Sequence, residues 1–69
     1  MIDLRLHGMK CRAIRNIRSY QGIISAFTEG TIEYEIENIG RHFVNVRWDN
    51  GLRLNVFHDE IELIDGDPL

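Results

Sequence analysis

The chain has 69 residues, enough for one domain, with 43% hydrophobic residues and a formal charge of −3 at pH 7. No apolar run is long enough for a transmembrane helix, and the first residues lack the apolar stretch of a secretory signal. A single cysteine, Cys11, excludes an internal disulfide. We therefore expect one cytoplasmic domain, covering residues 1–69, that does not enter a membrane.

Charge is unevenly distributed along the chain. Residues 1–20 hold five basic side chains against one acid, a net charge of +4, whereas residues 21–69 have a net charge of −7. If the two parts occupied different faces, the molecule would have an electric dipole. The simpler interpretation, which we favour, is that they neutralise each other across the fold.

The first twenty residues predict two short strands. Apolar and polar residues alternate over 2–6, and Gly8 ends this segment. Residues 9–17 also alternate, although part of this stretch fits one face of a helix as well. Because the rest of the chain favours strands, we predict a strand over 9–17 with a bulge near Ala13 and Ile14.

A long loop and a regular strand follow. Residues 19–30 contain two glycines and no sustained periodicity, so we interpret them as a long excursion. We expect three of its apolar side chains to fold inward: Ile23, Ile24 and Phe27. Residues 31–37 alternate cleanly, with their glutamates outward, and residues 38–41 form a turn. The inward side chains of this strand are Ile32, Tyr34 and Ile36.

The most informative segment is 42–58, a β-hairpin whose register follows from its own residues. Directly opposed side chains share a face of the sheet, so apolar residues must oppose apolar residues. A two-residue turn at Asn50 and Gly51 would oppose core and surface positions. A three-residue loop, 49–51, with glycine in the left-handed position avoids this conflict. It gives the inner pairs Trp48–Leu52, Val46–Leu54 and Val44–Val56.

The same register fixes the outer face of the hairpin. Its predicted outer pairs are Phe43–Phe57, Asn45–Asn55 and Arg47–Arg53, with His42 opposite His58 at the open end. Two opposed arginines repel each other, so a neighbouring strand should supply negative charge. Placing Ile36 beside Val44, Tyr34 beside Val46 and Ile32 beside Trp48 would set Glu33 beside Arg47. A slip of two residues would keep the same faces, so this second register is the less certain one.

The chain ends with a predicted 3₁₀ turn over 58–60, a short strand over 61–64 and a frayed tail over 65–69. The stretch 56–64 resembles the strand–3₁₀–strand ending of SH3-type domains. Residues 30–32, which open a bent strand, are similar to KOW- and Tudor-like barrels and to short uncharacterised bacterial proteins of that shape. The resemblance implies an all-β, SH3-like small barrel of about five strands over residues 9–64, with an N-terminal arm over 1–8.

Catalysis and metal binding have little support in the sequence. His42 and His58 are predicted neighbours, and Cys11 or His7 could join them, but no spacing typical of a zinc site is present. Cys11 lies in an alternating apolar row and is better explained as a small core residue. We therefore predict no catalytic residues, no metal and no cofactor.

Nucleic-acid binding is the alternative function. Small barrels often bind RNA or DNA through a basic face that carries aromatic rings. The candidate residues are Arg12, Arg15, Arg18 and Tyr20. A second set, formed by Arg47, Arg53, Phe43 and Phe57, lies beside the glutamates of the 31–37 strand, which would repel phosphate. The acidic pI of about 5.5 also opposes nucleic-acid binding.

Protein interaction is the function that we favour. The predicted outward pair Phe43–Phe57 is unusual for a solvated face, and Ile39 lies in the adjoining turn. The candidate interaction surface is Phe43, Phe57, Ile39, His42 and His58. If these rings are exposed, we expect a homodimer or a docking surface for a partner protein. The alternative is that the 19–30 loop or the N-terminal arm covers the rings and makes them a second small core.

Overall fold

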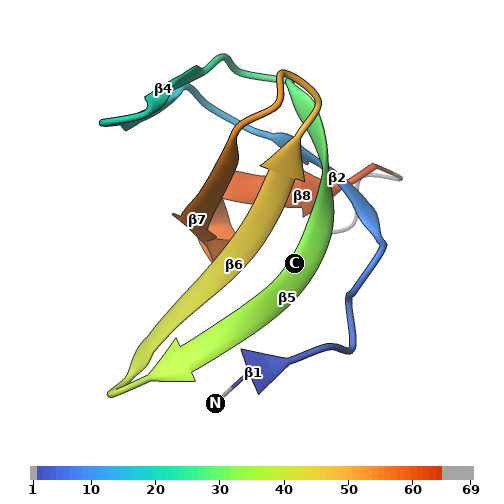
Figure 1. The fold of residues 1–69 in the computed structure, drawn as a ribbon, viewed down its shortest axis with the longest axis vertical. Helices are drawn as coiled ribbons and strands as arrows, with labels where there is room; N and C mark the ends of the chain where they lie inside the picture. The colour runs from blue at the N-terminus through green and yellow to red at the C-terminus, as the bar shows by residue number, and fades with distance from the viewer. Residues whose placement is uncertain (1, 65–69) are drawn as a thin grey trace.

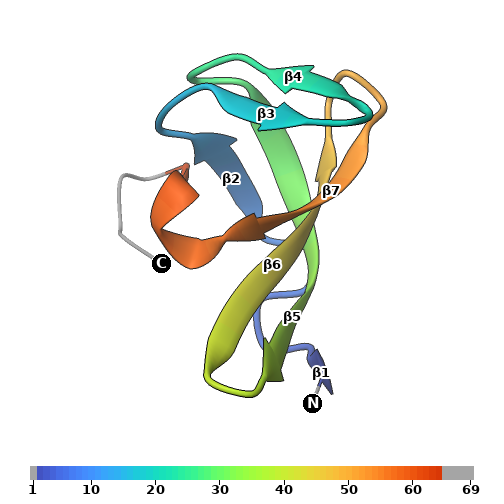
Figure 2. The same ribbon diagram turned by 90° about the vertical axis from the view of Figure 1, so that its left-hand side faces the viewer.

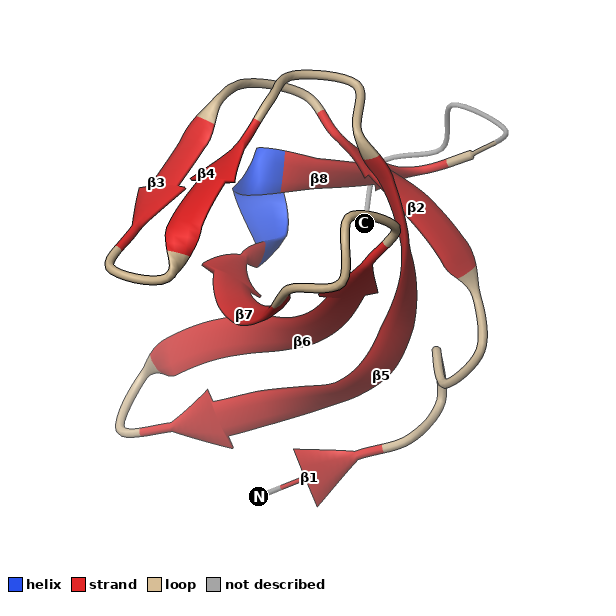
Figure 3. Cartoon of the chain, turned by 45° about the horizontal axis from the view of Figure 1, so that its top comes forward, coloured by secondary structure: helices blue, strands red, loops and turns tan. Residues whose placement is uncertain are grey.

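The computed structural model describes residues 2–64, so the tail predicted over 65–69 lies outside the described residues. The regular elements of this part of the chain are strands and one 3₁₀ turn (Figure 3). The strands are β1 (Ile2–Asp3), β2 (Lys10–Ala13), β3 (Ile17–Ser19), β4 (Gly22–Ile24), β5 (Glu29–Asn38), β6 (Arg41–Trp48), β7 (Arg53–Phe57) and β8 (Ile61–Leu63). The 3₁₀ turn, η1 (His58–Glu60), directly precedes β8. The all-β class and the position of this turn are confirmed. No helix among residues 2–64 is long and apolar enough to cross a membrane.

The main sheet is antiparallel and has the order β7-β6-β5-β2-β8 (Figure 1). Strand β5 is long and bent, so that β2 pairs with its first residues and β1 with its last. Strands β3 and β4 form a separate hairpin beyond one end of this sheet (Figure 2). Across the described residues the sheet is open, with β7 and β8 as its edge strands.

The predicted count of about five strands was too low, since residues 2–64 form eight. The expected strand over 9–17 is broken: β2 ends at Ala13, and the chain resumes as β3 only at Ile17. The expected excursion over 19–30 is partly regular, because β4 folds back on β3 with Ile17 opposite Ile24. The N-terminal arm also contributes β1, which adds to the far end of β5.

The core lies between the bent main sheet and the elements that cross its ends. Its buried apolar residues come from seven strands, β2 to β8: Cys11, Ala13, Ile17, Ile24, Ile32, Val44, Val46, Trp48, Leu54, Val56 and Ile61. Of the three loop residues expected to point inward, only Ile24 is buried, whereas Ile23 and Phe27 are exposed. Phe27 has a positive φ of 69°, so the backbone there turns and directs the ring to solvent.

The register predicted for the β6–β7 hairpin is confirmed. Val44 opposes Val56, Val46 opposes Leu54, and the three outer pairs are also formed. In the connecting loop, the Gly51 N–H donates to the Trp48 carbonyl at 2.9 Å, and the Trp48 N–H donates to the Leu52 carbonyl at 2.8 Å. Gly51 has a φ of 94°, the left-handed conformation that a three-residue loop requires.

The register predicted between β5 and β6 is wrong. Ile32 opposes Val46, but Tyr34 opposes Asn45, so Glu33 is an extra residue in a β-bulge. A bulge of one residue exchanges the two faces of the strand beyond it. As a result, Glu35 takes an inner position opposite Val44, and Ile36 takes an outer position opposite Phe43. Tyr34 and Ile36, which we expected to face inward, therefore lie on the outer face.

Ion pairs join the basic and acidic parts of the chain, as expected from the charge distribution. The Arg12 Nε lies 2.6 Å from the Glu62 Oε1, between the adjacent strands β2 and β8. The predicted contact of Glu33 with Arg47 also forms, at 3.5 Å, although the two residues are not directly opposed. Ion pairs across the fold thus neutralise part of the unevenly distributed charge.

Candidate functional site

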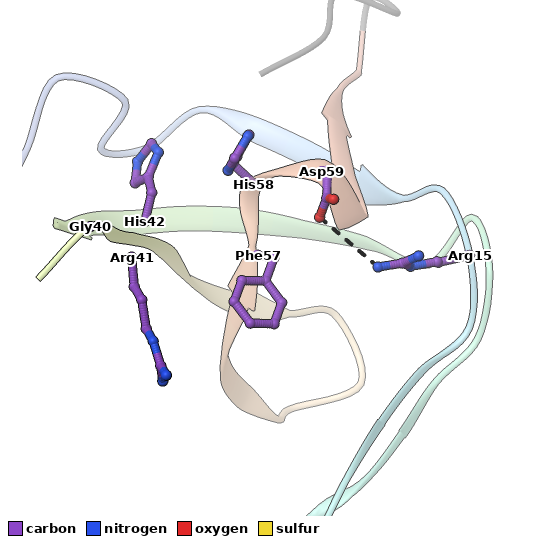
Figure 4. A pocket seen from close by; sticks show the side chains of 7 residues that line it. All are labelled: Arg15, Gly40, Arg41, His42, Phe57, His58 and Asp59. Atoms are coloured by element: carbon purple, nitrogen blue, oxygen red, sulfur yellow. Dashed lines mark ion pairs between the residues drawn. The ribbon is translucent and has the colours of Figure 1, made fainter. Parts of the chain in front are cut away.

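A groove lies at the open end of the β6–β7 hairpin, and we call it the hairpin-end groove (Figure 4). Strand β7 ends at Phe57, where the chain turns into η1, and this leaves the first residues of β6 beside the turn. The groove has a volume of about 420 Å³, within the range of about 300–1,000 Å³ that is common for ligand sites. Its lining residues are Arg15, Gly40, Arg41, His42, Phe57, His58 and Asp59.

Two ring pairs define this end of the hairpin. The Phe43 and Phe57 ring centroids are 5.0 Å apart, and the His42 and His58 centroids are 5.2 Å apart in a stacked arrangement. Successive residues of a strand point to opposite faces, so the two pairs lie on opposite faces of the sheet. Figure 4 shows this directly, with Arg41 and Phe57 on one side of the ribbon and His42 and His58 on the other. The expected His42–His58 neighbourhood is confirmed.

The phenylalanine rings differ in exposure. Phe57 remains 49% exposed, so neither the 19–30 segment nor the N-terminal arm encloses it in a second core. Phe43 is half-buried, because it lies in register between Phe57 on β7 and Ile36 on β5. Aromatic and apolar neighbours on the same face are a common way for a sheet to stabilise such a pair.

The phenylalanines belong to a longer apolar row that the sequence analysis missed. Ile2 opposes Ile36, Ile36 opposes Phe43, and Phe43 opposes Phe57, so these four residues cross β1, β5, β6 and β7 on the outer face. We call them the apolar row. Ile2 is 64% exposed, and contiguous exposed apolar side chains are typical of interaction sites. The missing signal was the bulge at Glu33, which moves Ile36 outward.

Ile39 lies at the tip of the hairpin that joins β5 to β6. Its side chain is 93% exposed, and its φ is 49°, in the left-handed region. Gly40 has a φ of 73°, so both central residues of this two-residue turn are left-handed, as in a type I′ turn. A β-branched residue is unfavourable in that conformation, and asparagine or glycine is normally found there.

A buried carboxylate supports the histidine side of the groove. Glu35 is only 7% exposed, and its Oε1 lies 2.8 Å from the Nε2 of His42. This contact fixes the His42 ring against His58 and gives the buried carboxylate a polar partner. Glu35 could be placed here only after the bulge was known, since the alternating pattern predicted it on the outer face.

Glu60 links two other parts of the groove. Its Oε1 accepts a hydrogen bond from the Phe57 N–H at 2.8 Å, and its Oε2 lies 3.5 Å from Arg15. Arg15 also approaches Asp59, at 3.9 Å. The 3₁₀ turn therefore holds both the backbone of Phe57 and an arginine that comes from the β2–β3 connection.

The four residues proposed for nucleic-acid binding come from β2, from the β2–β3 connection and from the β3–β4 hairpin. Arg12 and Arg15 are engaged with acids on β8 and η1, whereas Arg18 and Tyr20 belong to the β3–β4 hairpin and its turn. Tyr20 is 95% exposed at the turn of that hairpin. Two of the four residues, Arg12 and Arg15, thus have acidic neighbours within the molecule.

Cys11 is fully buried in the core, as expected. Burial, and next the charge of Asp49, raise the pKa of its thiol to about 11. The thiolate is the reactive form of cysteine, so this side chain is a poor nucleophile at neutral pH. Within residues 2–64, no group of three or more histidine, cysteine or acidic side chains is arranged to hold a metal ion.

Comparisons with known proteins place no relative beside this chain. No protein-family model matches the sequence, no curated protein matches it, and no solved structure matches the fold. The functional assignment therefore rests on the geometry of the hairpin-end groove and the apolar row.

Proposed function

We propose that the chain is a non-enzymatic protein-interaction module whose hairpin-end groove and apolar row dock a segment of another protein. The observation that carries this proposal is the position of Phe57. Its ring is half exposed, lines the groove and also ends the apolar row. One side chain thus joins a concave site to an apolar strip, and aromatic anchors of this kind supply much of the binding energy in protein interfaces.

The conformation of Ile39 supports the same surface. A β-branched residue in a left-handed turn costs about 1–2 kcal/mol, and a 93% exposed side chain recovers none of that by burial in this molecule. Unfavourable backbone conformations tend to persist where a residue has a role other than stability. Contact with a partner would bury the Ile39 side chain beside the groove.

The extent of the surface favours a short segment over a second copy of the chain. A stable protein–protein interface buries about 800 Å² per partner, roughly a sixth of the 4689 Å² exposed by this molecule. A row of four residues and a small groove supply only part of that area. An extended segment of a partner needs less contact, and it can follow a groove along a sheet edge.

The strand order and the 3₁₀ turn before the last strand support an SH3-like barrel as the architecture of this module. In that proposal, η1 carries the chain from β7 at one edge of the sheet to β8 at the other. Sheets of this kind are strongly curved, and β5 is bent in the same way in Figure 1. The cytoplasmic location expected from the sequence remains part of the proposal.

Nucleic-acid binding is the second candidate, and the exposed Tyr20 with Arg18 on the β3–β4 hairpin is the observation that favours it. One exposed ring and one arginine provide fewer contacts than single-stranded nucleic acid usually requires. The short ion pair of Arg12 with Glu62 reduces the positive charge still available to phosphate.

Affinity capture from native lysate, with nuclease treatment, tests the proposal. Phe57→Ser removes the shared ring, and Tyr20→Ser is the matched control because it removes another exposed aromatic ring away from the groove. We expect the wild-type chain and the control to retain the same protein after nuclease treatment, and Phe57→Ser to lose it. Thermal unfolding of each variant shows that the fold is intact.

Three results would contradict the proposal. Equal capture by all variants would mean that Phe57 is not part of the binding surface. Loss of the captured material on nuclease treatment would favour the nucleic-acid alternative. If light scattering showed a dimer that Phe57→Ser breaks, the surface would bind a second copy of the chain and not a segment of another protein.

A further inference from the structure

The lining of the hairpin-end groove has more cationic than anionic side chains, although the chain as a whole is acidic. Two arginines, Arg15 and Arg41, stand against one carboxylate, Asp59, and the rings of His42 and His58 complete the polar lining. The formal charge of the whole chain is −3. A local excess of positive charge in a concave site raises the local concentration of anionic ligands.

The two arginines are only partly neutralised by the protein. Arg41 is exposed at the start of β6, and no ion pair to it is found among residues 2–64. Arg15 lies 3.5 Å from Glu60 and 3.9 Å from Asp59, distances too long for strong charge-assisted hydrogen bonds. Both guanidinium groups can therefore gain from a further carboxylate.

The arginines also have a defined arrangement around the apolar part of the groove. In Figure 4, Arg41 and Arg15 extend from different segments of the chain on either side of the Phe57 ring. Arg41 belongs to β6, and Arg15 to the connection between β2 and β3. The order along the groove is therefore cation, aromatic ring, cation.

We infer that the hairpin-end groove binds an extended acidic peptide segment, with an apolar side chain against Phe57 and carboxylates at Arg41 and Arg15. This inference rests on the proposed function and names the chemistry of the partner. Arginine pairs with carboxylates in a planar, two-bonded geometry, so the ends of the groove select acidic residues. The Phe57 ring between them selects an apolar residue by burial.

A peptide fits this charge pattern better than a nucleic acid does. Asp59 lies in the lining, and two further carboxylates contact lining residues: Glu60 lies 3.5 Å from Arg15, and Glu35 lies 2.8 Å from His42. A phosphate backbone presents one charge per nucleotide and needs several unpaired cations in sequence. A peptide can place its carboxylates at the two arginines and keep neutral groups beside Asp59.

Selection from a display library of short randomised peptides, with the full chain as bait, tests the inference. We expect the enriched peptides to share an apolar residue flanked by aspartate or glutamate. A labelled synthetic copy of the most enriched peptide is then titrated by fluorescence polarisation. Its glutamine-substituted version should bind about tenfold more weakly, and an ionic strength of about 0.5 M should weaken the acidic peptide most.

Substitution of Arg41 tests whether this side chain binds a carboxylate of the peptide. Arg41→Ala should weaken the acidic peptide about threefold to tenfold and leave the affinity for the glutamine version nearly unchanged. Arg53→Ala is the matched control, because Arg53 is an exposed arginine on β7 that does not line the groove. It should leave both affinities unchanged.

The outcomes separate the inference from the proposed function. Enriched peptides without acidic residues that still require Phe57 would overturn the inference and leave the interaction module standing. An absence of any enriched peptide would overturn the inference. A mixed-sequence oligonucleotide that displaces the labelled peptide more strongly than the unlabelled peptide does would also overturn it. Equal effects of Arg41→Ala and Arg53→Ala would also contradict it.

Discussion

Replacing Ile39 with asparagine should make the protein more stable. Ile39 has a φ of 49° in a turn whose next residue, Gly40, is also left-handed. The left-handed conformation costs a β-branched residue about 1–2 kcal/mol, whereas asparagine followed by glycine is the preferred pair in a type I′ turn. The side chain is 93% exposed, so its removal forfeits almost no burial energy. We expect Ile39→Asn to raise the free energy of unfolding by about 1 kcal/mol.

Urea and thermal denaturation, followed by the fluorescence of the single tryptophan, measure this gain. Trp48 is buried, so its emission changes on unfolding. For a domain of this size, 1 kcal/mol corresponds to an increase in Tm of about 4–8 °C. Ile39→Val keeps the β-branch and serves as the control, with no gain expected. An Ile39→Asn variant no more stable than Ile39→Val would refute the reasoning that Ile39 is conformationally strained.

Three further predictions concern the core, the thiol and the 3₁₀ turn. A Cβ on Gly30 would lie 2.7 Å from the Val46 Cγ1, so the Gly30→Ala variant should lose about 1–3 kcal/mol of stability through overpacking. Alanine restricts the unfolded chain more than glycine does, and this offsets about 0.4–1 kcal/mol of the loss. Urea denaturation should show that adding Val46→Ala partly restores the stability of Gly30→Ala, and a Gly30→Ala variant as stable as the wild type would contradict the close packing. Burial raises the pKa of Cys11 from 9.0 to about 11, so the unfolded state loses its proton first and stability should fall between pH 9 and 11 by at most about 2–3 kcal/mol. Denaturation across that range should show a smaller fall for Cys11→Ala, and equal falls would contradict the assignment. Glu60→Ala removes the hydrogen bond to the Phe57 N–H and should cost about 0.5–2 kcal/mol, whereas Glu60→Gln should retain most of it in the same denaturation assay; equal losses would show that this hydrogen bond is not formed.

The β6–β7 hairpin could be predicted residue by residue because its constraints are local. Two apolar rows, separated by a short loop with Gly51, admit only one register that keeps the rows on the same face. The same register correctly opposed Phe43 to Phe57. The core position of Cys11 was also predictable, since an apolar residue in an alternating strand is usually buried.

The β5–β6 register could not be predicted in the same way. A bulge at Glu33 changes which face each later residue occupies, and nothing in the alternating pattern of the strand marks it. The bulge is contacted from outside the strand: the Gly8 N–H donates to the Ile32 carbonyl, and the ring Nδ1 of His7 lies 2.7 Å from the Glu33 carbonyl oxygen. These contacts depend on how the N-terminal arm folds back.

The candidate site shows the same division between local and long-range information. Its histidines, Phe57 and Ile39 were found from the hairpin alone, because they flank its open end. Arg15 was assigned to a different surface, since only the folded chain brings the β2–β3 connection beside η1. Ile2 and Ile36 were missed because their alignment with Phe43 depends on the bulge and on β1.

The central claim is that the open end of the β6–β7 hairpin is the binding surface of this protein. An NMR titration of the isotope-labelled chain with the enriched acidic peptide tests this most directly. The account predicts that the amide shifts concentrate at residues 39–43 and 57–59 and at Arg15, with residues 18–23 of the β3–β4 hairpin unaffected. Shifts centred on the β3–β4 hairpin, with 39–43 and 57–59 unchanged, would contradict it.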